Sequence, residues 1–353
     1  MTAAPPGTEH RRTTIRDVAA LAGVDVSLVS RVLNDHPKAS AAPATRERIW
    51  AAARTLGYRP NVLARGLRMA RTWTLGLLLP NLSNPMYAEI ARAAEERARA
   101  RGYGLIFGTH VDGGGDPTFE RLLEERRVDG LLVASGTLGD ADLRRVASAG
   151  HGPVVMLNRR VRGVGPSSTV DDAAGAAVAA GHLADLGHRR VAGIFGPGGI
   201  DTTRRRRSGF LAAAEAAGLK ATLVDMDGLD PAAGHAAADE IFRAHPGVTA
   251  IFASTFAIGM GVERAARAAG VRIPADLSLI ALHDSELADF LNPPMTTVAL
   301  PVGEMAHRGV DLLLALIDGG APRSVVARTP PELRRRESTA RPPGGARAGR
   351  EGR

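Results

Sequence analysis

The feature that most constrains the fold is a stretch near the N-terminus, residues 13–34, whose pattern predicts two short helices joined by a turn. Apolar residues recur there at the spacing of one helical face. Thr14 and Asp17 form a capping-box pair at the start of the first helix, Gly23 ends it, and Asp25 is placed to cap the second helix. Two short helices around a glycine turn are typical of the helix-turn-helix, so this segment predicts a DNA-binding unit.

The second of these helices has two distinct faces. Val29, Val32 and Leu33 have the spacing of an inward apolar face. The outward residues, which we expect to meet the edges of a DNA groove, are Val26, Ser27, Ser30, Arg31 and Asn34. A small structural three-helix unit is the alternative interpretation, because two helices around a glycine are common in proteins.

The distribution of charge favours the nucleic-acid interpretation. Residues 1–71 contain 12 Lys and Arg against 5 Asp and Glu, which is +7 of the net charge of +8. Residues 333–353 add +5, so the long stretch between these two segments is slightly acidic. A basic N-terminal fifth is suited to phosphates, whereas the middle of the chain is not built to lie along DNA.

A third helix completes the N-terminal unit. Its apolar face runs from Ile49 to Leu56, and Gly57 ends it. Pro60 then opens a short helical stretch over residues 61–68. This stretch is too short to be stable alone in water, so it needs a partner to fold.

From Trp73 onward, short apolar runs alternate with helical stretches rich in Ala, Arg and Glu. The runs predict strands at residues 75–79, 105–107, 131–134, 154–157, 191–195, 250–253 and 277–282. There are more strands than one doubly wound sheet normally has, and a polar break falls at residues 163–168. The pattern therefore predicts an α/β core of two lobes with parallel, doubly wound sheets, and a ligand cleft between them at the carboxyl ends of the strands.

Composition excludes several classes of protein. The chain of 353 residues is 44% hydrophobic, enough for a large core in two or three domains, and it contains no cysteine. Disulfides, thiolate catalysis and cysteine metal sites are therefore excluded. With no apolar run of about 18 residues and no signal-peptide pattern, we expect the protein in the cytoplasm, without membrane contact. The two ends, residues 1–12 and 341–353, have the composition of disordered segments.

Several motifs, taken in order, resemble the LacI/GalR family of bacterial transcription factors, the lactose and galactose repressors. Besides the helix-turn-helix, the matching segments are residues 56–61 (LGYRPN), 81–87 (NLSNPMY), 127–131 (RVDGL), 186–191 (LGHRRV) and 336–339 (REST). The resemblance covers residues 13 to about 340. It implies a periplasmic-binding-protein-like core and a homodimer on a pseudo-palindromic, double-stranded operator. It also implies a cleft for a small effector, such as a sugar or sugar derivative.

On this resemblance the chain divides into a headpiece, a hinge and a core. The expected boundaries are a disordered arm at 1–12, the headpiece at 13–59, the hinge at 60–71, the core at 72–340 and a disordered basic tail at 341–353. Within the core, the first lobe is expected at about 72–168 and 297–325, and the second at about 169–296 and 326–340.

The resemblance also assigns roles on the reading helix. It puts Val26, Ser27 and Arg31 at the edge of the major groove, where an arginine can bind guanine with two hydrogen bonds. Ser30 and Asn34 then face phosphates.

In the hinge, Leu67, beside Arg68, lies where the family inserts a leucine between base steps of the minor groove, and both residues are expected to contact DNA. The alternative for Leu67 is a linker leucine that packs on the core. Around residues 41–43 the chain has two residues more than the family's usual spacing. They lie beyond the reading helix, which should therefore be unchanged.

For the effector cleft, the resemblance puts Asn84 and Tyr87 on the first lobe. It puts Asp171, Arg206 and Asp284 on the second lobe or at the crossover. These side chains could hold hydroxyl, amide or anionic groups of a ligand.

Two departures from the family change what the cleft is expected to bind. The usual Asn-Asp pair is replaced by Thr255-Phe256, and Leu229 stands at a position that is often aromatic. The pocket thus lacks a carboxylate that other members use on sugar hydroxyls. We expect free monosaccharides to bind poorly, and a less polar effector, or none, is an open alternative.

Other signals are weak. The pair Asp171-Asp172 could form a metal or acid–base site, but capping of the next helix is favoured. The turn at residues 196–199 lacks the spacing of a phosphate-binding loop. We therefore expect no catalytic residue, no metal and no cofactor. A solute-binding protein is opposed by the headpiece and the missing signal peptide, and an α/β enzyme by the missing nucleophile, metal cluster and cofactor loop.

Overall fold

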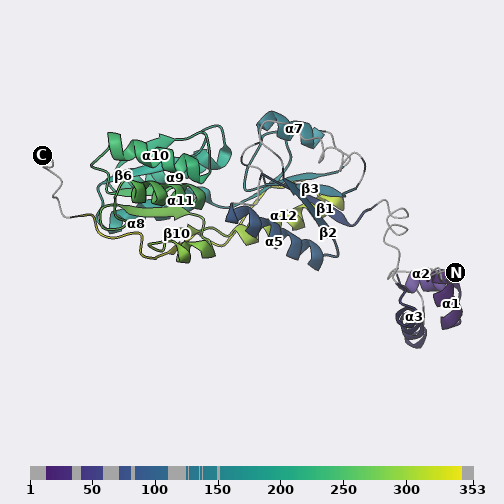
Figure 1. Ribbon diagram of the computed structural model, residues 1–353. Helices are drawn as coiled ribbons and strands as arrows, with labels where there is room; N and C mark the ends of the chain where they lie inside the picture. The colour runs from purple at the N-terminus through teal and green to yellow at the C-terminus, as the bar shows by residue number, and fades with distance from the viewer. Residues whose placement is uncertain are drawn as a thin grey trace, which may run out of the picture. The chain divides into compact units, whose positions relative to one another are not determined.

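A computed structural model describes residues 13–33, 41–58, 71–80, 84–109, 125, 127–134, 136, 138–148 and 152–343. The chain divides into two compact units, Met1–Thr72 and Trp73–Arg353 (Figure 1). Each unit has hydrophobic packing of its own.

The described residues of the N-terminal unit form three helices: α1 (Ile15–Ala22), α2 (Val26–Leu33) and α3 (Pro43–Thr55). The Asp17 carboxylate accepts hydrogen bonds from the backbone N–H and from the hydroxyl of Thr14, both at 2.8 Å. Gly23 ends α1 with a φ of 63°, a left-handed conformation that glycine adopts without strain. The predicted helix-turn-helix is confirmed.

The apolar faces of the three helices meet in one small core. Its buried residues are Val18, Ala19, Ala22, Val29, Val32, Leu33, Ile49, Ala52 and Ala53. These are positions that the helical spacing predicted to face inward. Pro43 is the first residue of α3, so residues 41–43 lie at the start of α3, beyond the eight residues of α2.

The C-terminal unit contains two six-stranded sheets. The strands of the first are β1 (Thr74–Leu79), β2 (Gly104–Thr109), β3 (Gly130–Val133), β4 (Val154–Leu157), β5 (Ser167–Thr169) and β11 (Val325–Val326). Those of the second are β6 (Arg190–Phe195), β7 (Lys220–Asp225), β8 (Ala250–Ala253), β9 (Ser278–Leu282), β10 (Thr296–Ala299) and β12 (Glu332–Arg334). The strand orders are β11-β5-β4-β3-β1-β2 and β12-β10-β9-β8-β6-β7.

Helices cover both faces of each sheet. They are α5 (Pro85–Ala100), α7 (Asp140–Ser148) and α12 (Val302–Ile317) in the first lobe, and α8 (Asp172–Asp185), α9 (Asp201–Ala216), α10 (Pro231–Ala244) and α11 (Phe256–Ala268) in the second. A short 3₁₀ helix, η1 (Glu286–Phe290), precedes β10. In the first lobe, α5 and α12 pack together on one face and α7 lies over the other (Figure 1). In the second, α8 and α9 pack on one face, and α10 and α11 on the other. The predicted two-lobed, doubly wound α/β core is confirmed.

Sheet membership corrects some details of the sequence prediction. Strand β12 pairs antiparallel with β10, whereas a parallel sheet was expected. Because β10 belongs to the second sheet, the chain returns to the first lobe after Ala299 and not before Thr297. The expected polar break at residues 163–168 includes part of β5, whose three residues are buried. Its Ser168 hydroxyl donates to the carbonyl oxygen of Met305 at 2.7 Å, so a polar sequence is satisfied inside the core.

Helices α10 and α11 approach closely because glycines lie at their contact. A Cβ atom on Gly261 would lie 2.0 Å from the carbonyl oxygen of Pro231, and one on Gly234 would lie 2.2 Å from that of Ile258. Only the absence of a side chain at both positions permits this packing.

We therefore expect Gly261→Ala to lower the free energy of unfolding by about 1–3 kcal/mol, since α10 and α11 must separate to admit the methyl group. Gly181→Ala in α8 is the matched control, because no atom lies within 4 Å of its Cβ position. Gly181→Ala should raise the free energy of unfolding by up to about 1 kcal/mol through helix propensity alone. Urea unfolding of both variants measures the difference, and equal stabilities would contradict the close packing.

Candidate functional site

The outward face of α2 is the first candidate site. Val26, Ser27 and Arg31 are exposed and Ser30 is half-buried, as a surface that meets a groove requires. The Arg31 guanidinium donates to the backbone oxygen of Ser27 at 3.3 Å and to its hydroxyl at 3.4 Å. Two of the predicted base-contacting side chains therefore lie together, one helical turn apart.

Asp25 supports this face from the start of α2. Its carboxylate accepts a hydrogen bond from the Ser27 backbone N–H at 2.7 Å, which confirms the predicted cap. Hydrogen bonds from the side chain and then the backbone of Ser27 lower the pKa of Asp25 below its ordinary value. Asp25 therefore holds Ser27 at the first turn of α2.

Three of the predicted DNA contacts, Asn34, Leu67 and Arg68, lie outside the described residues. Their roles remain predictions from the family resemblance.

The second candidate site is a cavity between the two lobes, at the carboxyl ends of the strands, where such folds place their ligands. Its empty volume is about 390 Å³, which includes space open to solvent. Its lining residues are Asn84, Met86, Tyr87, Ala134, Gly136, Leu157, Asn158, Arg159, Thr202, Arg206, Leu229 and Thr255. Eight come from the first lobe's β1–α5, β3–α7 and β4–β5 segments, and the second lobe supplies the other four, Thr202, Arg206, Leu229 and Thr255.

Arg206, on α9, is the most constrained polar group of the cavity. It is only 3% exposed. Its Nε donates to Asp172 at 2.7 Å, Nη1 donates to the Ser254 carbonyl at 3.0 Å, and Nη2 lies 2.8 Å from His283 Nε2. A guanidinium has five N–H donors, so two have no partner among the described residues.

The acidic partner of Arg206 is shared. Asp172 is fully buried, and its second oxygen accepts a hydrogen bond from Arg205. Arg205 also donates to Asp201 at 3.1 Å and to the carbonyl of Asn158, across the lobes, at 3.0 Å. The two carboxylates and two guanidiniums form one buried network that joins α8, α9 and the first lobe.

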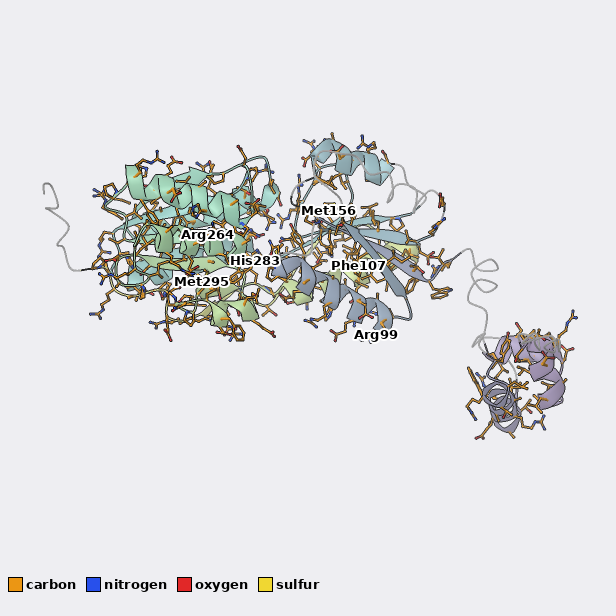
Figure 2. All side chains as sticks on the ribbon, in the orientation of Figure 1. Arg99, Phe107, Met156, Arg264, His283 and Met295 are labelled. Atoms are coloured by element: carbon orange, nitrogen blue, oxygen red, sulfur yellow. The ribbon has the colours of Figure 1, made fainter. Side chains whose placement is uncertain are left out.

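His283 is the basic partner of this network, and Figure 2 labels it where the two lobes meet. Burial lowers the pKa of His283 well below its ordinary value, and the charge of Arg206 lowers it further. The ring is therefore neutral. With Nε2 accepting from Arg206, the proton lies on Nδ1, which has no hydrogen-bond partner within the described part of the chain.

Asn158 approaches the cavity from the end of β4. It is 9% exposed, and its φ of 63° is a left-handed conformation that asparagine tolerates better than most residues. Its Nδ2 lies 3.7 Å from the Met86 sulfur, and its Oδ1 has no partner among the described residues. A buried amide oxygen without a donor is a place for a ligand hydroxyl or amine.

Of the six side chains predicted for the effector site, Asn84, Tyr87 and Arg206 line the cavity and the other three do not. Asp171 is exposed and caps α8, accepting from the Ala174 N–H at 2.9 Å. Phe256 is 2% exposed and packs in the core between α11 and the second sheet.

Asp284 has a structural role, and its role in effector binding stays a prediction. Its carboxylate accepts from the Thr297 hydroxyl at 2.5 Å and from Arg336 at 2.8 Å. Burial raises its pKa, but the hydrogen bonds from Arg336 and Thr297 outweigh this, so the pKa of Asp284 lies below its ordinary value. Asp284 thus anchors the C-terminal segment, and the preceding residue, His283, reaches Arg206.

The sequence prediction missed Asn158, Arg159, Thr202 and His283. Asn158 and Arg159 follow a predicted strand directly, a position that could have indicated them. His283 directly follows the predicted strand at 277–282 and carries the same signal, whereas Thr202 carries none, because its orientation depends on the turn before α9.

Within the described ranges, no helix is long and apolar enough to cross a membrane. The same ranges contain no group of three or more His, Asp or Glu side chains arranged to hold a metal ion.

Comparison with known proteins finds matches for both units of the chain. Residues 14–61 match the family described as bacterial regulatory proteins, lacI family, and residues 180–339 match the periplasmic binding protein-like domain. An HTH-type transcriptional regulator from the aml 5′ region of Streptomyces limosus is 36% identical, over 94% of this chain and 96% of its own length. The HTH-type transcriptional repressor PurR of Erwinia tasmaniensis is 33% identical, over 93% and 97%.

A solved structure extends the similarity to the whole architecture. The Lac repressor dimer bound to operator and the anti-inducer ONPF matches with a TM-score of 0.78 and 26% identity, over 94% of this chain and 100% of that one. Both the N-terminal unit and the two-lobed unit therefore have counterparts in one known protein.

Proposed function

Because the chain belongs to the LacI family of bacterial regulatory proteins, we propose that it is a sequence-specific DNA-binding transcriptional repressor controlled by a small effector. The observation that carries this proposal is the exposed face of α2, where Ser27 and Arg31 lie together on a compact three-helix unit. The cavity around Arg206 supports control by an effector. As the relatives are transcriptional regulators, we propose no enzymatic activity, and a site of action in the cytoplasm, where the bacterial chromosome lies.

The mechanism follows from coupling between two sites. We propose that a dimer folds its hinge segments, residues 60–71, on a pseudo-palindromic operator, inserts Leu67 into the minor groove and blocks transcription. The effector binds between the lobes of the core, residues 72–340, and shifts the population toward a state with unfolded hinges. The shift can be no larger than the difference in effector affinity between the two states.

Exposed apolar side chains support the homodimer. Strand β2 is an edge of the first sheet, and its Ile106 and Phe107 are 44% and 54% exposed. An edge strand with large apolar side chains is a natural interface, because it would otherwise promote aggregation. In the second lobe, Phe290 is 83% exposed. We propose that these residues contact a second copy of the chain.

Selection of bound DNA from a random pool tests the proposed function. We expect enrichment of one pseudo-palindromic sequence whose two halves are about one helical turn apart. Recovery of unrelated sequences in proportion to their abundance would refute sequence-specific binding.

Arg31→Ala should reduce discrimination between this operator and random DNA by about 1–3 kcal/mol, because a guanine contact is lost. Arg54→Ala is the matched control: it removes another exposed arginine, from α3, remote in sequence from the reading face. It should weaken binding to both DNAs alike. Fluorescence anisotropy at fixed salt measures both affinities, and equal losses on operator and random DNA in Arg31→Ala would contradict its assigned role.

A further inference from the structure

We propose that the cavity between the lobes selects an anionic, hydroxylated small molecule, a sugar-like carboxylate or phosphate ester, over its neutral parent. The proposal rests on the proposed function and names the chemical class of the effector. Its basis is the sign of the charge that the cavity presents, together with the polar atoms that have no partner in the protein.

The charged groups that line the cavity are guanidiniums. Arg159 and Arg206 are both in its wall, and among the described lining residues there is no carboxylate. The acidic partners lie behind them: Asp172 is fully buried at the Arg206 Nε, and Asp140 contacts Arg159 from the start of α7. A ligand in the cavity therefore meets the cationic ends of these ion pairs and not the anionic ones.

His283 leaves this positive charge in place. It lies against the outer nitrogen of Arg206 at 2.8 Å, where a carboxylate would neutralise the guanidinium on a second side. The imidazole is buried and neutral, so it orients Arg206 without cancelling its charge. One N–H on each terminal nitrogen of Arg206 has no partner among the described residues, and such groups donate well to carboxylate and phosphate oxygens.

Helix N-termini from both lobes add to the positive potential. Asn84 caps α5, Thr255 caps α11, and Thr202 is in the first turn of α9, and all three line the cavity. The N-terminal end of each helix carries a partial positive charge and unfilled N–H groups. The dipoles and the two guanidiniums therefore favour the same sign of ligand charge.

The remaining wall indicates the rest of the ligand. The buried Oδ1 of Asn158 needs a donor, which a ligand hydroxyl supplies and a simple inorganic anion does not. Leu157, Met86 and Leu229 form an apolar side suited to the carbon face of a small polyol. An anion that also carries hydroxyl groups can pair with the guanidiniums, donate to Asn158 and pack its carbon face on the apolar side.

Isothermal titration of the full-length protein tests the proposal with matched sets of ligands. The probes are glucose, galactose and mannose, each as the neutral hexose, the aldonate and the 6-phosphate. At least one anion should bind ten or more times tighter than its parent hexose, and its identity distinguishes carboxylate from phosphate. If a hexose binds as tightly as its anions, or if no member of the panel binds, the proposal is wrong.

Two variants of His283 test the cause. His283→Asp places a carboxylate beside Arg206 at a left-handed position that Asp tolerates, and it should weaken anion binding at least tenfold. His283→Asn, which also tolerates that backbone, removes the imidazole without adding charge and should change anion affinity less than threefold. Equal losses in both variants, or an unchanged anion affinity in His283→Asp, would overturn the electrostatic explanation.

Operator binding, measured on the same protein without ligand, separates this proposal from the proposed function. Specific operator binding without anion preference contradicts only the ligand class. Loss of specific operator binding in the unaltered chain contradicts the proposed function itself.

Discussion

Asp172→Asn is expected to lower the free energy of unfolding of the C-terminal unit by about 3–5 kcal/mol, the usual cost of removing one partner of a buried ion pair. Asp172 is fully buried and accepts from Arg205 and from Arg206, whose side chains are 17% and 4% exposed. An amide of the same size keeps one acceptor but turns its NH₂ group toward a guanidinium. Arg205 would keep Asp201 as its partner, but Arg206 would lose the carboxylate that accepts from its Nε.

Thermal unfolding followed by circular dichroism measures this effect. For a unit of this size about 1 kcal/mol corresponds to 2–4 °C, so the midpoint should fall by roughly 10 °C. Asp171→Asn is the matched control: the neighbouring residue is exposed, and asparagine caps a helix as well as aspartate does. Its midpoint should stay within about 2 °C of the unaltered protein. Similar losses in both variants would show that capping of α8, and not the buried network, stabilises this region.

Phe107→Asp is expected to dissociate the dimer and weaken operator binding at least 100-fold, or about 2.7 kcal/mol. Phe107 is labelled in Figure 2 and lies on β2, the exposed edge of the first sheet. A charge placed at the centre of an apolar interface must lose its hydration without gaining a partner. A monomer then reaches only one half of a two-fold operator.

Sedimentation velocity at micromolar protein, with anisotropy titration on the selected operator, measures the two effects of Phe107→Asp. Val326→Asp is the control, because Val326 is 41% exposed on β11, at the opposite edge of the same sheet. It should remain dimeric with unchanged affinity. A dimeric Phe107→Asp with normal operator binding would place the subunit interface elsewhere.

The sequence alone predicts the N-terminal unit in detail. Thr14, Asp17, Gly23 and Asp25 act on backbone groups within a few residues of themselves, so their caps and turn depend little on the rest of the protein. The strands with continuous apolar runs, such as β1 and β8, could also be predicted because their residues are buried on both faces.

Other strands have no such local signal. Strand β10 begins with Thr296 and Thr297, two polar residues that are fully buried. Thr296 is hydrogen-bonded to the C-terminal segment: the Arg336 N–H donates to its hydroxyl at 3.0 Å, and its own N–H donates to the Ser338 hydroxyl at 2.8 Å. Strand β7 is an edge strand and is only partly buried. These elements are stabilised by partners distant in sequence, and the pattern therefore missed them.

The candidate ligand site was likewise predictable in part from the sequence and determined in part by the tertiary structure. The sequence determined that polar side chains gather at the carboxyl ends of two parallel sheets, and Asn84, Tyr87 and Arg206 do line a cavity there. Only the tertiary structure decided which of two adjacent residues contacts Arg206. Of Asp171 and Asp172 it is Asp172, and of the two residues that follow β9 it is His283 and not Asp284. Adjacent residues at the end of a strand or the start of a helix point in different directions. The choice depends on one or two backbone dihedral angles, such as the φ of 70° at His283, that packing across both lobes imposes.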